Sequence, residues 1–195
     1  MKSLFDFIVS PDGERYNNSV KVGDKNLILN TEIYNHQYVN RDAVVLKVPV
    51  VNNTNIKEGD KLVVHHNVFR RWYNVKGIEK NSRSFMSDNE YAISSDQIFL
   101  HKPVDSEDWN AMEGFCFVQP LKSTDSFDMD TERPLIGIVE YTDGTHKKGD
   151  LVGFTPVSEY EFIIGDKRLY RVMTKFITIR YEYRGDEEKY NPSWA

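Results

Sequence analysis

The chain has 195 residues, a length at the border between one domain and two. It is 39% hydrophobic and 13% aromatic, which is enough to build a substantial core, and its net charge of −5 argues against a broad nucleic-acid-binding surface. No stretch approaches the roughly 20 apolar residues of a membrane span, and the N-terminus lacks a signal-like apolar run. The single cysteine, Cys116, excludes an intrachain disulfide and a cysteine-rich zinc site. We therefore expect a cytoplasmic protein without a membrane or nucleic-acid partner.

Strand signals dominate the chain, and sustained helical periodicity is absent from its sequence. Short β-branched or aromatic runs alternate with turn clusters such as Ser10-Pro11-Asp12-Gly13. Gly165-Asp166 separates two such runs and predicts a tight hairpin. In chain order, the sequence predicts strands at 5–9, 43–48, 61–64, 91–93, 98–100, 115–118, 135–141, 151–154, 160–164, 168–172 and 176–183. The expected fold class is therefore all-β.

A short sequence motif occurs twice along the chain. Lys-Glu-Gly-Asp-Lys-Leu-Val-Val at 57–64 is echoed by Lys-Lys-Gly-Asp-Leu-Val-Gly-Phe at 147–154. Each copy follows an apolar strand and precedes a strand anchored by a tyrosine. Three anchors align the halves: Val9 with Val118, Gly59 with Gly149, and Tyr91 with Tyr170. Repetition on this scale predicts two similar β-domains in tandem.

The boundary between the two domains is expected in a polar, proline-containing stretch. We predict a first domain at 1–102, a linker at 103–111, a second domain at 112–183 and a charged, frayed tail at 184–195. The second copy is shorter than the first before its middle strand and again after its Gly-Asp turn.

In the order of these elements, each half resembles the GroES-like co-chaperonin (chaperonin-10) family. Ile8-Val9-Ser10-Pro11 stands where that family has its opening strand, and residues 41–48 match its middle strand. Residues 57–65 are the best match to its Lys-x-Gly-Asp-x-Val motif. Leu27-Ile28-Leu29 stands where the family carries an aliphatic tripeptide in a mobile loop. The resemblance implies two tandem GroES-like β-barrels, with a candidate mobile loop at 17–38.

The resemblance also implies a function without chemistry of its own. A GroES-like protein forms a homo-oligomeric ring and caps a GroEL-like chaperonin ring in a nucleotide-dependent way, so that a client protein folds inside. Leu27, Ile28 and Leu29 would be the chaperonin-binding residues, and no cofactor is implied. The second half keeps the framework but not the tripeptide, because its loop at 123–133 is acidic and offers only Phe127 and Met129 as apolar residues.

Several alternatives remain open at this point. Residues 26–33 can also form an ordinary strand whose Leu27 and Leu29 face a core. The Asn- and Lys-rich, acidic composition favours a phage-encoded protein, whose client would include a capsid protein. A phage virion or capsid-associated protein that reuses the double barrel is the alternative function. A degenerate co-chaperonin that regulates rather than caps is a third.

Arg70-Arg71-Trp72-Tyr73 forms a cluster that predicts a hairpin or a subunit interface, because Trp, Tyr and Arg favour protein interfaces. The same residue types can stack on a single-stranded nucleic acid, but the acidic composition argues against it. His65 and His66 are adjacent, and adjacent residues on a strand point to opposite faces. We therefore expect no metal ion shared by this pair. With no nucleophile motif and no glycine-rich phosphate loop, we expect no enzyme activity.

Overall fold

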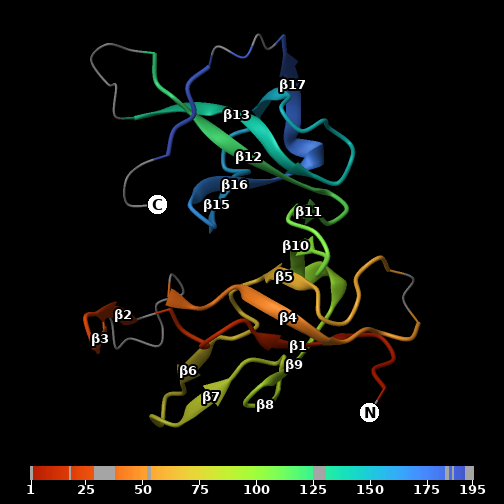
Figure 1. Cartoon of the computed structure of the whole chain (residues 1–195), viewed down its shortest axis with the longest axis vertical. Helices are drawn as coiled ribbons and strands as arrows, with labels where there is room; N and C mark the ends of the chain where they lie inside the picture. Colours follow the sequence, from red (N-terminus) through yellow and green to blue (C-terminus); the bar gives the residue numbers. More distant parts are fainter. Residues whose placement is uncertain are drawn as a thin grey trace. The chain divides into compact units, whose positions relative to one another are not determined.

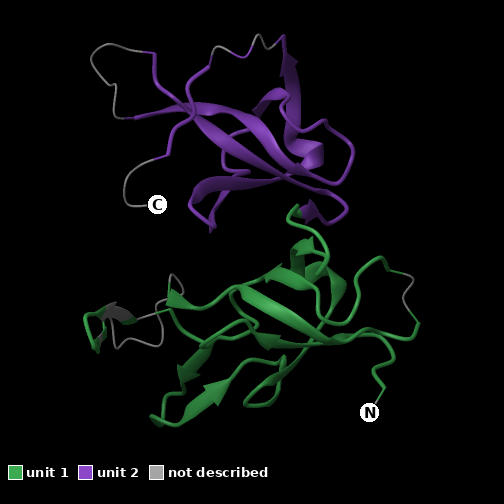
Figure 2. Ribbon diagram, in the orientation of Figure 1, with its two compact units in different colours: residues 1–109 green, residues 110–195 purple. Residues whose placement is uncertain are grey.

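The structure is a computed structural model that describes residues 2–17, 19–28, 38–51, 54–124, 131–182, 185 and 187–191. The chain divides into two compact units, 1–109 and 110–195, and the division falls within the segment 103–111 (Figure 2). Over the described ranges the protein is all-β, as expected, with strands joined by turns and short 3-10 helices. None of the helices in this part of the chain is long and apolar enough to cross a membrane.

Unit 1 contributes the strands β10-β5-β4-β1-β9-β8, in this order, to one antiparallel sheet (Figure 1). Two hairpins lie outside this sheet and pair only within themselves, β2 with β3 and β6 with β7. A 3-10 helix, η2 (Ser95–Gln97), precedes β10. The strands are β1 (Phe7–Pro11), β2 (Ser19–Val22), β3 (Lys25–Ile28), β4 (Asp42–Lys47), β5 (Lys61–Val64), β6 (Arg71–Tyr73), β7 (Glu79–Asn81), β8 (Phe85–Ser87), β9 (Glu90–Ile93) and β10 (Ile98–Lys102).

Unit 2 repeats the same strand order as β17-β14-β13-β12-β16-β15, and it too has a 3-10 helix, η3 (Thr174–Phe176), before its last strand. Its strands are β11 (Asn110–Ala111), β12 (Phe115–Lys122), β13 (Glu132–Thr142), β14 (Leu151–Phe154), β15 (Tyr160–Ile164), β16 (Lys167–Met173) and β17 (Ile177–Tyr181). Among the described residues, the strand pairings leave each framework sheet open rather than closed on itself.

The register of the two sheets agrees residue by residue. Val9 lies opposite Tyr91 in unit 1, and Val118 lies opposite Tyr170 in unit 2. The opening strand of each unit carries an irregularity just before these valines, between Ile8 and Val9 and between Phe117 and Val118. The sequence alignment of these anchors is therefore confirmed, and the two units share one pattern of pairing as well as one order of strands.

The Gly-Asp turn is also reproduced in detail. Gly59 and Gly149 both have φ +90°, a backbone conformation that favours glycine because it has no Cβ. The N–H of Gly59 donates to the carbonyl oxygen of Val45 at 2.8 Å, and the N–H of Val45 donates to the carbonyl oxygen of Asp60 at 3.0 Å. The turn of unit 2 repeats both bonds, at 2.8 and 2.9 Å, through Gly149 and Asp150.

Each unit has an apolar core built mainly of strand residues. Unit 1 buries Phe7, Val9, Val45, Leu62, Phe69, Tyr91, Ile93, Ile98 and Leu100, all at 2% exposure or less. Unit 2 buries a cluster of Cys116, Val118, Val139, Val152, Phe154 and Val172. Full burial of one aliphatic or aromatic side chain contributes about 1.5–3 kcal/mol. Burial raises the pKa of the Cys116 thiol to about 12, so this cysteine is a protonated, apolar core residue.

Three expectations need correction. Strands β2, β7, β8 and β11 were not predicted, β6 was predicted only as part of a hairpin, and β12 continues to Lys122 instead of ending at Pro120. The C-terminal tail is not frayed at 187–191, because Lys122 N–H donates to the Glu188 carbonyl oxygen at 2.9 Å and Tyr190 N–H donates to that of Pro120 at 2.8 Å. This segment therefore continues the sheet of unit 2 beside β12.

Candidate docking site

The β2–β3 hairpin carries an exposed apolar surface between the first two framework strands of unit 1. Its strands are joined by the turn Gly23-Asp24, with Gly23 at φ +61°. Val22 is 60% exposed, Leu27 56% and Ile28 61%. Leu27 and Ile28 therefore lie on a strand, yet they face solvent instead of a core. Leu29, like the rest of 29–37, lies outside the described residues.

Hydrogen bonds join the segment that enters the β2–β3 hairpin to the segment that leaves it. These two segments, residues 12–17 and 38–40, form the root of the hairpin. Tyr16 and Val39 form an antiparallel bridge, which is flanked by a bond from Asn17 N–H to the Tyr38 carbonyl oxygen at 2.7 Å. Asn40 is only 1% exposed, and its Nδ2 donates to the carbonyl oxygens of Asp12 at 3.1 Å and Glu14 at 2.8 Å. A buried amide with these partners fixes the path of the chain into and out of the hairpin.

Arg15 and Tyr16 join this root to the β6–β7 hairpin. The Arg15 guanidinium donates to the Phe69 carbonyl oxygen at 3.0 and 3.2 Å and to Asn81 Oδ1 at 3.0 Å. The phenol oxygen of Tyr16 accepts a hydrogen bond from the Arg71 N–H at 2.8 Å, and the Arg71 guanidinium lies 5.1 Å from the Tyr16 ring centroid. These contacts could not be predicted from the sequence, since their partners are far apart along the chain.

The cluster Arg70-Arg71-Trp72-Tyr73 lies at the start of the β6–β7 hairpin, with Arg71, Trp72 and Tyr73 on β6. Its turn is ordered by Asn74, whose Oδ1 accepts hydrogen bonds from the N–H groups of Lys76 and Ile78, both at 2.9 Å. The tip exposes two apolar side chains, with Val75 fully exposed and Ile78 53% exposed. In Figure 1 this hairpin extends from the body of unit 1 below the sheet.

Among its described residues, unit 2 has neither of these hairpins. Its connection between β12 and β13 is short, and Phe127 and Met129 fall in its part at 125–130, outside the described residues. Its connection between β14 and β15 spans only residues 155–159, where unit 1 has residues 65–84 before β8. The two exposed hairpins are therefore additions of unit 1 to a framework that both units share.

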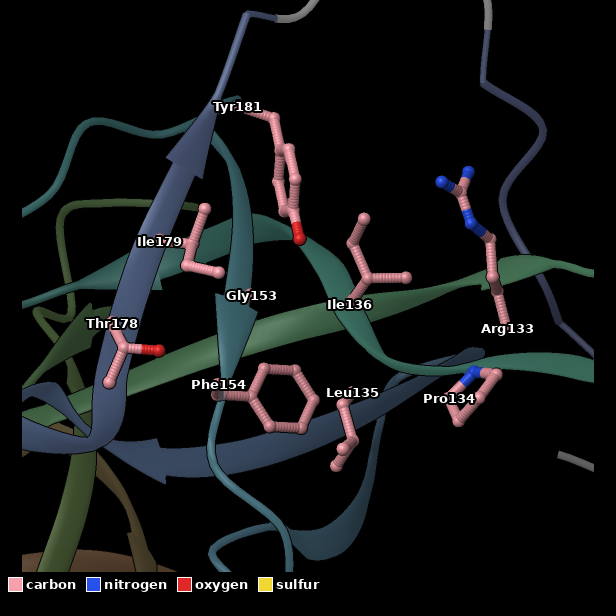
Figure 3. Close-up of a pocket in the computed structure, with 9 residues that line it drawn as sticks. All are labelled: Arg133, Pro134, Leu135, Ile136, Gly153, Phe154, Thr178, Ile179 and Tyr181. Carbon is pink, nitrogen blue, oxygen red and sulfur yellow. The ribbon is translucent and has the colours of Figure 1, made fainter.

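A shallow groove of about 310 Å³ with a mixed polar and apolar lining lies on unit 2 (Figure 3). Its apolar lining includes Leu135, Phe154 and Ile179, and Tyr181 lies along it. A Cβ on Gly153 would come within 3.2 Å of the Tyr181 ring, so a glycine here lets that ring lie close to β14. Arg133 stands at one end and pairs with Glu187 at 3.0 Å. The groove offers van der Waals contacts to an apolar side chain.

Two ionic clusters, each built around one buried charged residue, Arg168 or Glu140, stabilise unit 2. Arg168 donates to Glu132 Oε2 at 2.7 Å and to the Tyr170 phenol oxygen at 2.6 Å, and the Tyr170 hydroxyl donates to Glu132 Oε1 at 2.6 Å. Burial and the neighbouring Glu132 raise the pKa of Tyr170. Glu140 is 7% exposed in its side chain and accepts a hydrogen bond from Lys167 Nζ at 2.5 Å. Both clusters connect strands of one sheet and are structural.

His65 and His66 do not lie on a strand, so the expectation that their side chains point to opposite faces of one is wrong. Both residues follow β5 in a turn, and their rings stack with centroids 4.3 Å apart. His65 Nδ1 accepts a hydrogen bond from the Asn67 N–H at 3.1 Å. Over the described ranges, the structure contains no group of three or more His, Cys, Asp or Glu side chains that could hold a metal ion.

Comparison with known proteins gives no relative: no family model, no curated protein and no solved structure matches the chain.

Proposed function

We propose that this chain is a tandem GroES-like co-chaperonin, in which each framework sheet corresponds to one GroES-like barrel. It caps a chaperonin ring in a nucleotide-dependent way and assists the folding of a client protein. The ATPase activity belongs to the chaperonin, and the chain contributes binding alone. A phage origin and a capsid-protein client are part of the same proposal, as is assembly of the chain into a ring in the cytoplasm of the host.

One observation carries the proposal. A hairpin whose Leu27 and Ile28 are more than half exposed is inserted between the first two framework strands of unit 1. This is the place at which the GroES-like family carries its chaperonin-binding tripeptide. Exposed aliphatic residues on a projecting segment are costly to leave in water, and they are typical of a surface that a partner covers.

The energetics fit a weak contact that is repeated around a ring. Each aliphatic side chain of the hairpin contributes about 1.5–3 kcal/mol if a groove on the partner buries it fully. In a ring, once one copy has bound the chaperonin, its neighbours bind at a high effective concentration. Several weak contacts therefore add up to a strong overall affinity.

The direct test is co-sedimentation of the purified chain with a bacterial chaperonin, without nucleotide and with ATP or ADP. We expect nucleotide-dependent binding that is lost when Leu27, Ile28 and Leu29 are all changed to Ser. The matched control changes Val157 and Ile163, which are 96% and 50% exposed in unit 2, to Ser. Binding that survives the triple change would remove the assignment of this site, and absence of binding in every nucleotide state would count against the co-chaperonin.

A phage structural protein is the second candidate. It is favoured by one observation, namely that Leu27 and Ile28 lie on a paired strand, since a permanent interface needs no loop that folds on docking. Limited proteolysis separates the two candidates. Rapid cleavage between residues 17 and 38 in the free chain supports the co-chaperonin, and resistance there favours the structural protein.

A further inference from the structure

The β6–β7 hairpin concentrates positive charge in an acidic protein. Residues 70–83 contain five cationic side chains and one acidic one, Glu79, whereas the rest of the chain has 20 cationic and 29 acidic side chains. Glu79 pairs with Arg71 at 3.3 Å. Lys76, Lys80 and Arg83 are exposed and have no ion pair among the described residues. A net positive arm therefore extends from an otherwise negative chain.

The hairpin is an addition that the fold does not need and that the structure nevertheless holds in place. Unit 2 builds the same six-stranded framework with a connection of five residues at this point. In unit 1, Arg15 and Tyr16 bind the base of the hairpin, and Asn74 orders its turn. An arm with a restricted conformation loses little entropy when it docks. Its exposed Val75 and Ile78 add an apolar contact at the tip.

A complementary surface lies elsewhere on the same unit. The segment 104–109, Val-Asp-Ser-Glu-Asp-Trp, has three acidic side chains and no cationic one. Asp105, Glu107 and Asp108 are exposed, and Val104 is 70% exposed. The segment is ordered, because the Val104 N–H donates to Asp60 Oδ1 at 3.0 Å and the Ser106 N–H donates to the Pro103 carbonyl oxygen at 3.0 Å.

The two surfaces cannot neutralise each other within one chain. Figure 1 shows β6 and β7 at one end of unit 1, while β10, which leads directly into segment 104–109, lies at the other. Within the described residues, the only ion pair made by the acidic segment joins Glu107 to Lys102 at 3.5 Å. Two patches of opposite charge on opposite ends of one unit suit a head-to-tail contact between copies, which closes into a ring when the rotation between copies allows it.

We propose that the β6–β7 hairpin of one copy docks on the acidic segment 104–109 of a second copy of this chain. The cations Lys76, Lys80 and Arg83 face the three carboxylates, and Val75 and Ile78 pack near the partner's exposed valine. The proposal rests on the ring assembly in the proposed function, but it concerns the chain alone. Charge pairs at such an interface determine orientation and association rate more than they determine affinity, and the apolar tip supplies the desolvated contact.

The test is sedimentation velocity of the full chain at low and high salt. Wild type is expected to associate at low salt and to dissociate as salt rises, because exposed charges are screened over about 10 Å at 0.1 M salt. Changing Lys76, Lys80 and Arg83 to Glu, or Asp105, Glu107 and Asp108 to Lys, should each weaken association by about tenfold or more. The control changes Lys2, Lys57 and Lys147 to Glu, which lowers the net charge by as much as the hairpin reversal does, but outside both surfaces.

The two reversed variants provide a stricter test when they are mixed. Each repels itself, but the acidic hairpin of one is complementary to the basic segment of the other, so the mixture should associate as wild type does. Unchanged thermal unfolding temperatures show that the variants fold. A wild type that stays monomeric at low salt, reversals without effect, or a mixture that stays dissociated would each overturn the proposal. So would hairpin-dependent binding of a single-stranded oligodeoxynucleotide by a monomeric chain, which would assign the arm to nucleic acid.

Discussion

The phenol oxygen of Tyr16 accepts a hydrogen bond from the backbone N–H of Arg71 at 2.8 Å, although the two residues are 55 positions apart. Through this bond, the root of the β2–β3 hairpin is attached to the base of the β6–β7 hairpin. The two additions of unit 1 are therefore held by a shared set of contacts, in which Arg15 also takes part. Movement at the root of one hairpin is expected to affect the other.

Tyr16→Phe tests this connection with a small change. The variant keeps the buried ring and its contact with the Arg71 guanidinium but removes the hydrogen-bond acceptor. We expect a loss of about 0.5–1.5 kcal/mol in the free energy of unfolding and faster hydrogen exchange at the Arg71 amide. Tyr181→Phe, at a ring that is 42% exposed, is the matched control. Equal rates of hydrogen exchange at the Arg71 amide in wild type and Tyr16→Phe would show that this hydrogen bond does not restrict the base of the β6–β7 hairpin.

Gly137→Ala tests a close approach that distinguishes the two units. A Cβ on Gly137 would lie 2.8 Å from the carbonyl oxygen of Gln119, a backbone atom that cannot rotate away. The equivalent position in unit 1 is Ala43, which is fully buried and does carry a Cβ. We expect Gly137→Ala to destabilise the protein by about 1–3 kcal/mol, as measured by urea unfolding. A neutral effect would mean that β12 and β13 can separate without cost.

The duplicated turn allows a comparison within one chain. Asp60 Oδ2 accepts from the Lys57 N–H at 2.8 Å, and its Oδ1 accepts from the Val104 N–H at 3.0 Å. Asp150 makes only the first of these bonds, to the Lys147 N–H at 3.1 Å. Loss of a buried acceptor costs about 1–3 kcal/mol for each N–H left unpaired. Asp60→Ala should therefore be the more damaging of the two changes in urea unfolding, and a larger effect of Asp150→Ala would contradict this.

The ionisation of Glu140 makes the stability of unit 2 depend on pH in the acid range. Burial alone would raise the pKa of this carboxyl, but the hydrogen bond and charge of Lys167, with the charges of Lys189 and Lys148, lower it below the ordinary value of 4.5. A carboxyl with a lowered folded-state pKa adds stability that is present above its unfolded-state pKa and is lost as pH falls through the folded-state value. The free energy of unfolding should fall below pH 4.5 in wild type. Glu140→Gln should be less stable at neutral pH and should show a smaller fall.

The framework strands could be predicted because their residues alternate or cluster in apolar, β-branched runs between clear turns. The anchors Val9, Gly59 and Tyr91 aligned the halves correctly, since a duplicated core keeps its buried valine, its left-handed glycine and its core tyrosine in place. The strands β6, β7 and β8 could not be predicted in the same way. They are three residues long and mostly exposed, so neither face has an apolar pattern.

The side chains that hold the two hairpins in place could not be predicted from the sequence either. Asn40 reads as a polar turn residue, yet it is 1% exposed and binds two carbonyl oxygens 26 and 28 positions away. Arg15 reads as a surface charge and instead contacts Phe69 and Asn81. Such roles depend on which loops the fold brings together, and local sequence carries no periodic signal for a contact of that range.

The most direct measurement of the central claim is hydrogen exchange of the chain in the presence of a bacterial chaperonin and ADP, compared with the free chain. The account predicts that residues 19–28 become protected on addition of the chaperonin, and that changing Leu27, Ile28 and Leu29 to Ser abolishes this protection. Amides of the β12–β13 connection in unit 2 should exchange at the same rate in both states. Binding without protection of β2 and β3, or protection centred on unit 2, would contradict the assignment of the docking site.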